Sequence, residues 1–375
     1  MAEYGDIVFI DPRNRISKGG QDVILRHEKY KQLFTNITKS NICVWSKFEN
    51  TNSDLEIRNE LRFIKLIRFF FKYKKDPAFK KVRLLIAGDP WMSFYYAYFL
   101  KKTIFKNSSI QLQIHGDYGH KDWQHESKMN NLKFKIILKS IALADSIRFV
   151  GKTQLLNMLE NSKDIMGKCF IAPIPSLIFS EKVLKKNEIV SMKRPESIAL
   201  IGRLHRERGI NTFIDLIENL LKDGYCGKIL IVGDGPLRRK MSKKIRKFDS
   251  EYQAQFLGFL SNSEMSLLWK DIGLIVSVAK YESFCRVARE AAANGVPGIF
   301  LRSSGIEDFA SEISAEYCRI LDSDNLKKDF MKSYHSLINV VISPKIELLI
   351  WCNEVKYLDN LIDSWVDLTR VNRLI

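Results

Sequence analysis

Two arginines that follow an apolar run are placed for chemistry. Arg203 and Arg208 flank a short loop directly after residues 197–202, which have the β-branched, apolar character of a buried strand. Guanidinium groups stay charged and offer planar forks of hydrogen-bond donors, so the pair suits the oxygens of a diphosphate. Two arginines in a solvated surface loop would look the same, and the pair alone does not decide between these interpretations.

Two glutamates, Glu282 and Glu290, form the second candidate pair. We predict a helix that begins near Phe284, which leaves Glu282 in the preceding loop and Glu290 almost two turns into the helix. That offset spans about 12 Å in a helix, roughly the length of a nucleotide-sugar headgroup. The loop carboxylate can accept hydrogen bonds from sugar hydroxyls and the helical one from ribose hydroxyls, while the N–H groups of residues 283–286 can hold phosphate. The alternative is two acidic residues on a solvated helix.

These residues sit on a repeated strand-and-helix pattern. Apolar runs at 197–202, 228–233 and 272–278 each lead into a loop followed by a helical pattern, and the first two end in a glycine. Such alternation predicts parallel βα units, whose ligands bind at the carboxyl ends of the strands. Gly233, in the sequence Gly233-Asp234-Gly235-Pro236, keeps side chains away where a ligand or another backbone comes close.

The first half of the chain repeats the pattern. Strands are predicted at 7–11, 41–45, 82–88, 110–114 and 146–150, and helices at 21–34 and 93–102. We therefore expect an α/β protein in which two Rossmann-like βαβ domains face a central cleft. The predicted organisation is a first domain over 1–180, a linker over 181–196, a second domain over 197–342, and a helical segment over 343–375 that packs back on the first domain.

Two features of the first half could belong to a site. His115 follows the predicted strand 110–114 and precedes glycines, which is typical of a site residue, although a core histidine remains the alternative. Gly19 and Gly20 end a basic loop at the start of a predicted helix, where backbone N–H groups can bind an anion. A plain strand-to-helix connection explains the glycines equally well.

Composition limits the classes of function. With 60 Lys and Arg against 43 Asp and Glu, the net charge is +17, which predicts an anionic partner: nucleic acid, an anionic membrane or a phosphorylated small molecule. The six cysteines form no CxxC pair, which argues against a disulfide framework or a zinc site. Without a signal-peptide pattern or a bilayer-length apolar run, we expect a cytoplasmic protein, or one peripheral on the cytosolic face of the inner membrane.

One basic segment is a candidate for contact with an anionic membrane. Residues 54–75 read as a helix in which apolar residues alternate with seven lysines and arginines. A basic amphipathic helix of this kind can lie on an anionic membrane, so we predict a peripheral contact through 54–83. A domain helix with a solvated basic face is the alternative.

Taken together, the central motifs resemble a known family. The order strand–GRLxxxRG, strand–GDGP, strand–ESFxxxxxE–AxAxGVP is similar to the donor-binding lobe of glycosyltransferase family 4, whose members have the GT-B fold. The resemblance is specific over about 197–310 and looser in the first half. It implies a retaining enzyme that uses a nucleotide sugar.

The resemblance assigns roles to individual residues. It implies that Arg203 and Arg208 bind the donor diphosphate, that Glu282 holds the transferred sugar and that Glu290 holds the ribose. It also implies a place near the donor sugar for His115. The catalytic set is then His115, Glu282, Arg203 and Arg208. The donor-binding set comprises Gly19, Gly20, Arg203, Arg208, Gly233, Glu282, Ser283, Phe284, Cys285, Arg286 and Glu290.

This chain departs from the family pattern at two of these positions. Arg208 stands where the family has lysine, which keeps the charge and changes its reach. Cys285 stands where the family has glycine, which predicts a narrower sugar pocket or a differently turned backbone. Both departures affect the identity of the sugar more than the type of reaction.

The expected function is transfer of a hexose-type sugar from a UDP- or GDP-linked donor to a saccharide or lipid-linked saccharide acceptor. The expected context is bacterial surface polysaccharide, whether O-antigen, capsule or lipopolysaccharide. We expect no cofactor and no metal, because the arginines and the helix dipole can stabilise the leaving diphosphate. Asp322-Ser323-Asp324 resembles a metal-binding DxD motif but falls outside the predicted strand ends.

Three alternatives remain open. The chain could be another GT-B enzyme such as a nucleotide-sugar epimerase, a basic nucleic-acid-binding protein, or a catalytically inactive scaffold. Dispersed lysines and the lack of a nucleic-acid-binding motif argue against the second, so no nucleic acid is expected. The presence of Arg203, Glu282 and Glu290 argues against the third.

Overall fold

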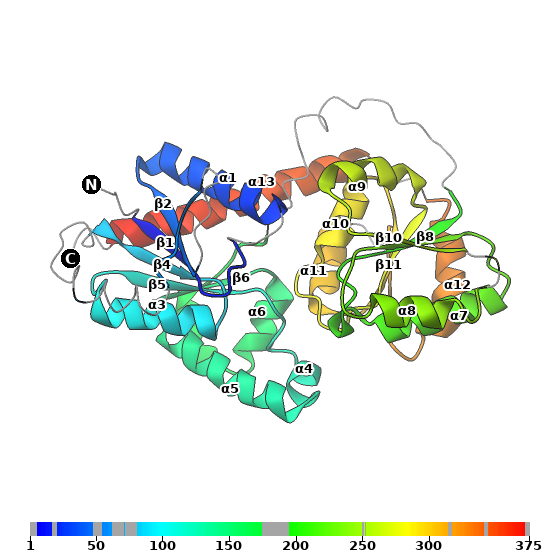
Figure 1. Cartoon of the computed structure of the whole chain (residues 1–375), viewed down its shortest axis with the longest axis horizontal. Helices are drawn as coiled ribbons and strands as arrows, with labels where there is room; N and C mark the ends of the chain where they lie inside the picture. The colour runs from blue at the N-terminus through cyan, green and yellow to red at the C-terminus, as the bar shows by residue number, and fades with distance from the viewer. Residues whose placement is uncertain are drawn as a thin grey trace. The chain divides into compact units, whose positions relative to one another are not determined.

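The chain forms two compact α/β units, seen in a computed structural model (Figure 1). One unit comprises Met1–Pro175 and Val355–Ile375, and the other comprises Ser176–Glu354. The structure describes residues 6–16, 21–47, 55–61, 71, 81–174, 195–249, 251, 253–313, 317–340 and 344–371. Gly19, Gly20 and nearly all of the predicted linker 181–196 lie outside these residues.

A parallel sheet forms the centre of the first unit. Its order is β3-β2-β1-β4-β5-β6-β7. The strands are β1 (Ile7–Asp11), β2 (Ile42–Ser46), β3 (Glu56–Arg58), β4 (Leu84–Ala87), β5 (Ser109–Ile114), β6 (Ser146–Phe149) and β7 (Cys169–Ile171). Every residue of β1, β2, β4 and β6 is buried, as expected of a parallel sheet covered on both faces.

Helices cover both faces of this sheet. They are α1 (Gln21–Thr38), α3 (Met92–Thr103), α4 (Lys121–His125), α5 (Lys128–Leu143), α6 (Lys152–Leu159), a 3-10 turn η2 (Lys163–Lys168) and the last part of α13 (Pro344–Val371). On one face, Trp365 of α13 packs against Phe9 and Tyr30 with ring centroids 5.5 and 5.6 Å away. The opposite core contains Phe94 of α3 and Ile137 of α5.

The second unit contains another parallel sheet, of order β10-β9-β8-β11-β12-β13. Its strands are β8 (Ser197–Ile201), β9 (Lys228–Val232), β10 (Ala254–Gly258), β11 (Leu274–Ser277), β12 (Gly298–Leu301) and β13 (Cys318–Leu321). Its helices are α7 (Ile210–Lys222), α8 (Arg238–Ile245), α9 (Asn262–Leu268), α10 (Arg286–Ala293), α11 (Ser304–Glu312) and α12 (Leu326–Leu337), with short 3-10 turns η4 (Arg206–Arg208) and η5 (Trp269–Asp271). The predicted α/β class with two Rossmann-like units is confirmed.

The helix predicted over residues 54–75 is wrong for residues 55–61, whereas Phe71, the other described residue of that range, is helical. Residues 55–61 are not helical and include β3, which pairs in parallel with β2. The reason is the local alternation: Leu55 and Ile57 are buried while Glu56 and Arg58 are partly exposed, a period of two that favours a strand. Most of the rest of segment 54–83 lies outside the described residues. Among the helices that the structure describes, none combines the length and apolar character needed to cross a bilayer.

Candidate active site

The order of the second sheet creates a switch point beside β8. From β8 the chain moves outward to β9 and β10, then returns to add β11 on the other side of β8. Loops leaving the carboxyl ends of two such strands run in opposite directions, which leaves room for a ligand between them. The predicted residues of this unit lie in the loops that follow β8, β9 and β11 or at the start of the helix beyond.

The loops after β8 and β9 are packed against each other. Gly233 has φ +122°, and a Cβ added there would lie 2.0 Å from the carbonyl oxygen of Gly202. The two loops are also joined by a 2.9 Å hydrogen bond from the N–H of Leu204 to the carbonyl of Asp234. Gly233 therefore serves close approach of two backbones, one of the two interpretations that the sequence left open.

Arg208 and Glu282 meet although they are 74 residues apart in the sequence. Arg208 Nη1 donates to Glu282 Oε2, and the glutamate side chain is only 14 % exposed. The neighbouring Gly209 has φ +66°, and a Cβ there would lie 2.1 Å from the carbonyl oxygen of Val278. This close approach holds the end of the β8 loop against the loop after β11, and so places the guanidinium at the carboxylate.

The backbone turns at Cys285, one of the departures from the family pattern. Cys285 has φ +50° and caps α10, which begins at Arg286 rather than near Phe284 as predicted. A left-handed residue cannot continue a right-handed helix, which explains the later start. Glu290 consequently lies about one turn into the helix, and not almost two.

The Cys285 thiol belongs to the hydrophobic core of this unit, where it packs with residues such as Ala288 and Ile306. Burial and the charge of Glu282 raise the pKa of the Cys285 thiol to about 12. The side chain is thus a protonated, core-facing group at neutral pH. The departure from glycine acts on the backbone turn and on the packing behind the loop.

Glu290 is paired with the first residue of its own helix. Arg286 Nη2 donates to Glu290 Oε1 at 3.1 Å, and the glutamate side chain is 12 % exposed. An arginine at a helix N-terminus is unfavourable for the helix itself, because it adds positive charge to the positive end of the dipole. That position is favourable for an anionic ligand, since the guanidinium and the free N–H groups of the first turn attract the same charge.

Arg289 is a site-forming residue that the sequence reasoning missed. Its side chain is buried, its Nη1 donates to the carbonyl of Phe284, and its Nη2 contacts both carboxylate oxygens of Glu312 at 2.9 Å. The guanidinium also lies 3.8 Å from the centroid of the Phe284 ring. Arg289 therefore ties the loop between Glu282 and Cys285 to α11. An arginine among the alanines of a core-facing helix was the available signal.

A second contact fixes the same loop. The N–H of Gly305, at the start of α11, donates to the carbonyl of Glu282 at 2.6 Å. A Cβ at Gly305 would lie 2.3 Å from the backbone nitrogen of Phe284, so the helix can approach only because this residue lacks a side chain. Ser283 and Phe284 are both buried between these contacts.

Arg203 lies apart from this set of ion pairs. Its Nη2 donates to Glu207 Oε2 at 3.1 Å within its own loop, and both side chains are about two-thirds exposed. Glu207 therefore holds the guanidinium at the surface. Asp322, in the DxD-like sequence, accepts a 2.7 Å bond from Arg302. The described residues contain no cluster of three or more His, Cys, Asp and Glu placed to hold a metal ion.

His115 belongs to the first unit and directly follows β5. Its Nε2 lies 3.2 Å from Gln113 Oε1. Burial and the positive charges of Arg148, Arg26 and Arg15 lower its pKa to about 3. The imidazole is therefore neutral at physiological pH, and acts there as a hydrogen-bonding group and not as a cation.

The comparisons with known proteins agree with this architecture. The protein-family model described as "Glycosyl transferases group 1" matches residues 182–321, which lie in the second unit. The amylovoran biosynthesis glycosyltransferase AmsD of Erwinia amylovora is 24 % identical over 166 residues, which cover 41 % of this chain and 46 % of AmsD. Protein CapJ of Staphylococcus aureus is 27 % identical over 259 residues, covering 66 % of this chain and 62 % of CapJ. The chain thus spans less than two thirds of the length of either relative.

A solved structure extends the likeness to both units. HepE of Anabaena, determined in complex with UDP-glucose, superposes with a TM-score of 0.68 and 12 % identity over 97 % of this chain and 100 % of HepE. At that identity the likeness concerns the fold. It confirms the GT-B fold that the motifs predicted.

Proposed function

We propose that this protein is a retaining glycosyltransferase that moves a sugar from a nucleoside-diphosphate donor to an acceptor hydroxyl. The observation that carries the proposal is the pair of arginine–glutamate contacts, Arg208–Glu282 and Arg286–Glu290, at the switch point of the second sheet. Each contact puts a donor for phosphate beside an acceptor for hydroxyls. That is the combination a nucleotide sugar requires, since it alternates anionic and hydroxyl-bearing groups.

The diphosphate would be held by Arg208, the N-terminus of α10 and Arg286. When the bond between the anomeric carbon and the diphosphate oxygen breaks, its electron pair remains on the diphosphate. Fixed positive groups that already face this position stabilise the developing charge without reorganisation. We propose that they do so without a divalent ion, and that Arg203 joins them by exchanging its exposed contact with Glu207 for a phosphate oxygen.

The carboxylates would recognise the hydroxyl groups. With Arg208 on the diphosphate, Glu282 is released to accept hydrogen bonds from the transferred sugar, and Glu290 to accept them from the ribose. The identity of the nucleoside diphosphate in the donor, UDP or GDP, is a proposal drawn from the resemblance. The first unit would bind a saccharide or lipid-linked saccharide acceptor, with the neutral His115 near the sugar. The likeness to AmsD supports bacterial surface polysaccharide as the context.

The test is a thermal-shift screen against UDP, GDP, ADP, CMP and TDP, each with magnesium or with a chelator. A ligand that binds only the native state raises the midpoint of unfolding, by an amount that grows with the logarithm of the ratio of its concentration to its Kd. We expect one nucleoside diphosphate to stabilise the protein equally with and without metal. Stabilisation that requires magnesium would contradict metal independence, and no shift with any nucleotide would contradict the proposal.

Site variants would connect binding with transfer. We expect Glu290→Gln to weaken nucleotide binding, and Glu282→Gln to lower turnover while nucleotide affinity is kept. Glu218→Gln is the matched control, because Glu218 forms an exposed ion pair with Lys222 on the outside of α7. If both site variants transfer sugar at the rate of this control, the assignment of the two glutamates is wrong.

A further inference from the structure

An exposed apolar stripe runs along α3 in the first unit. Met92, Tyr95 and Phe99 lie on one side of the helix and are 40 %, 38 % and 45 % exposed. The opposite side, which includes Phe94 and Leu100, is fully buried in the core. A contiguous set of large apolar side chains in water is unfavourable and marks an interaction surface.

The exposed side of α5 mixes lysines with apolar residues. Its exposed apolar side chains are Met129, Leu132 and Leu143. Its exposed lysines are Lys128, Lys133, Lys135 and Lys139. The spacing places Lys128, Leu132, Lys135 and Lys139 along one line of the helix surface, away from the buried Phe134, Ile137 and Ile141.

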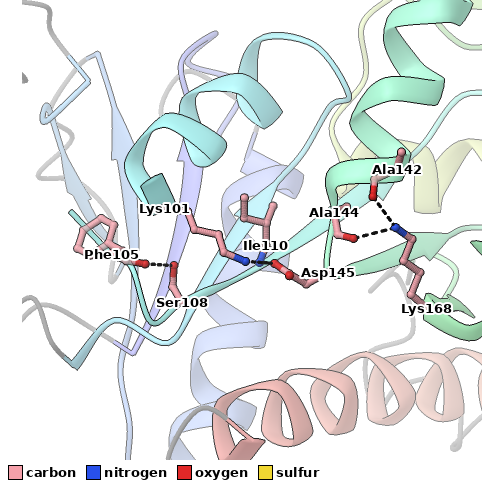
Figure 2. A network of polar contacts seen from close by, with 8 residues as sticks. All are labelled: Lys101, Phe105, Ser108, Ile110, Ala142, Ala144, Asp145 and Lys168. Atoms are coloured by element: carbon pink, nitrogen blue, oxygen red, sulfur yellow. Dashed lines mark hydrogen bonds and ion pairs between the residues drawn. The ribbon is translucent and has the colours of Figure 1, made fainter. Parts of the chain in front are cut away.

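The two helices lie side by side on the same face of the sheet. Ser140 Oγ of α5 donates to the carbonyl of Pro90 at 2.6 Å, and Lys133 Nζ lies 5.9 Å from the centre of the Trp91 ring at the start of α3. At the other end of α3, Lys101 Nζ bonds to Asp145 Oδ2 at 2.6 Å, as Figure 2 shows. The two helices thus pack on the same core, with α5 in contact with the residues that lead into α3, and we call their exposed residues together the α3–α5 face.

Polar contacts hold the end of α5 in place. Figure 2 shows Lys168 Nζ donating to the carbonyls of Ala142 and Ala144, at 2.9 and 3.0 Å, where α5 ends. Asp145 accepts both from Lys101 and from the N–H of Ile110 on β5. The α3–α5 face is thus attached to the central sheet at this end, and presents its apolar and basic side chains from a fixed position.

The charge on this face has one sign. Neither α3 nor α5, both described in full, contains an aspartate or a glutamate. Lys102 is exposed on α3 beside the four exposed lysines of α5, and the nearby Asp145 already bonds to Lys101. Asp122 and Glu126, just before α5, are exposed as well. The five exposed lysines outnumber them, so the face joins a net positive charge to exposed aliphatic and aromatic side chains.

A second basic helix shows that charge alone does not produce such a face. Helix α8 of the second unit carries the exposed Lys240, Lys243 and Lys244, but its apolar residues Met241 and Ile245 are both buried. Helix α8 therefore exposes its basic side chains to solvent and keeps its apolar side chains in the core. The α3–α5 face has a similar density of lysines and exposes its apolar residues as well.

We propose that the α3–α5 face binds the surface of an anionic lipid bilayer. The lysines would contact lipid phosphates, and the apolar side chains would enter the boundary between headgroups and acyl chains. A second copy of the chain is disfavoured, because a two-fold contact would bring the lysines against each other. A nucleic acid would use the lysines but would leave Met129, Leu132 and Leu143 without a role.

The proposal goes beyond the transfer reaction and does not depend on which donor is used. It assigns the membrane contact to a part of the chain different from segment 54–83, where the basic pattern in the sequence had suggested it. An acceptor carried by a lipid would be presented to the protein from that same surface.

The test is flotation of the full-length protein with vesicles of phosphatidylcholine, alone or with phosphatidylglycerol added. We expect binding only to the anionic vesicles.

Reversing three charges on α5, in the triple variant Lys128→Glu, Lys135→Glu and Lys139→Glu, should weaken partitioning into these vesicles roughly 100-fold or more, because each lysine contributes separately near the surface. The matched control reverses the same number of charges on α8, as Lys240→Glu with Lys243→Glu and Lys244→Glu, and should weaken it by less than about threefold. Equal losses in both triple variants would overturn the proposal.

A second variant separates a bilayer from a soluble polyanion. Phe99→Ser with Leu132→Ser removes exposed apolar groups and leaves every charge in place. We expect this variant to lose vesicle binding roughly 10-fold or more while its retention on heparin is unchanged. Vesicle binding at the level of the parent would show that charge alone acts, and would overturn the bilayer assignment. The nucleotide-induced thermal shift, measured on each variant, reports the second unit separately, so failure of the proposed transfer function would not be mistaken for failure of membrane binding.

Discussion

The carboxyl edges of the two sheets differ in charge: one has paired charged side chains, and the other has a neutral histidine. At the second unit's edge, Glu282 and Glu290 each contact an arginine, so that charges are present and paired before any ligand arrives. At the first unit's edge, burial and nearby positive charges lower the pKa of His115 to about 3, so the imidazole is uncharged at neutral pH. One edge is prepared to exchange ion pairs with an anionic ligand, and the other offers neutral hydrogen bonding.

This difference in charge suits the two units to different parts of the substrates. A diphosphate brings formal charge and needs fixed counter-charges, which in the proposed function Arg208 and Arg286 of the second edge would supply. A sugar hydroxyl brings no charge and needs acceptors and donors in register. A protonated histidine could only donate, whereas the neutral His115 can donate from one ring nitrogen and accept at the other.

The largest effect is expected on folding stability, when the arginine that holds the loop before α10 is removed. Arg289→Met keeps most of the side-chain volume but leaves the carbonyl of Phe284 without its donor and Glu312 without its partner. Breaking a buried ion pair on one side costs about 3–5 kcal/mol of folding stability. Urea unfolding measures this loss. Glu312→Gln should cost less, since that carboxylate is partly exposed; similar stability of Arg289→Met and the parent would show that the contact does not hold the loop.

The next largest effect should fall on turnover. If Glu282 holds the transferred sugar as proposed, Glu282→Gln removes the negative charge from that contact. We then expect kcat to drop about 100-fold or more, as on removing one preorganised contact to a reacting group. Glu290→Gln should instead raise KM for the donor. Steady-state kinetics with the donor found in the nucleotide screen separate the two. The reverse pattern would exchange the roles of the carboxylates.

A smaller effect is expected from pH at the first edge. The pKa of His115 is lowered in the folded state to about 3 and that of His27 to about 4, mainly by burial, from 6.5 in the unfolded chain. Stability from the neutral rings is present above pH 6.5 and is lost as the pH falls below it, because only the unfolded state then binds the protons. From pH 7 to pH 5.5, His115→Gln should lose about 1 kcal/mol less stability than the parent. Parallel pH profiles would contradict the burial of a neutral ring.

The smallest effect should come from restoring the family glycine. Cys285→Gly relieves the left-handed backbone at φ +50°, worth about 1–2 kcal/mol, and removes a buried thiol of similar packing value. The two changes oppose each other, so the free energy of unfolding should move by less than about 1 kcal/mol. Denaturant titration measures it. A loss above about 2 kcal/mol would mean that the thiol contributes more to the core than its size predicts.

Some of the site could be predicted because it rests on local rules. The strands before Gly202, Gly233 and Val278 followed from apolar runs that each lead into a loop and a helical pattern, and the parallel βα pattern follows from their order. Two predictions failed because a helical pattern was extended over residues that adopt another backbone conformation. The helix predicted over residues 54–75 overlooked the alternation at Leu55 and Ile57, and the predicted start of α10 overlooked the left-handed turn at Cys285.

The sequence by itself determined the fold class, the charge of the chain and which residue types stand at the strand ends, because periodicity and turn chemistry act over a few neighbouring residues. Only the tertiary structure decided the partners. Glu282 meets Arg208 across 74 residues, Arg289 meets Glu312 on the next helix, and Lys133 of α5 lies over the ring of Trp91, just before α3. These contacts depend on strand order and on which helix faces the core, and the packing of distant segments sets both.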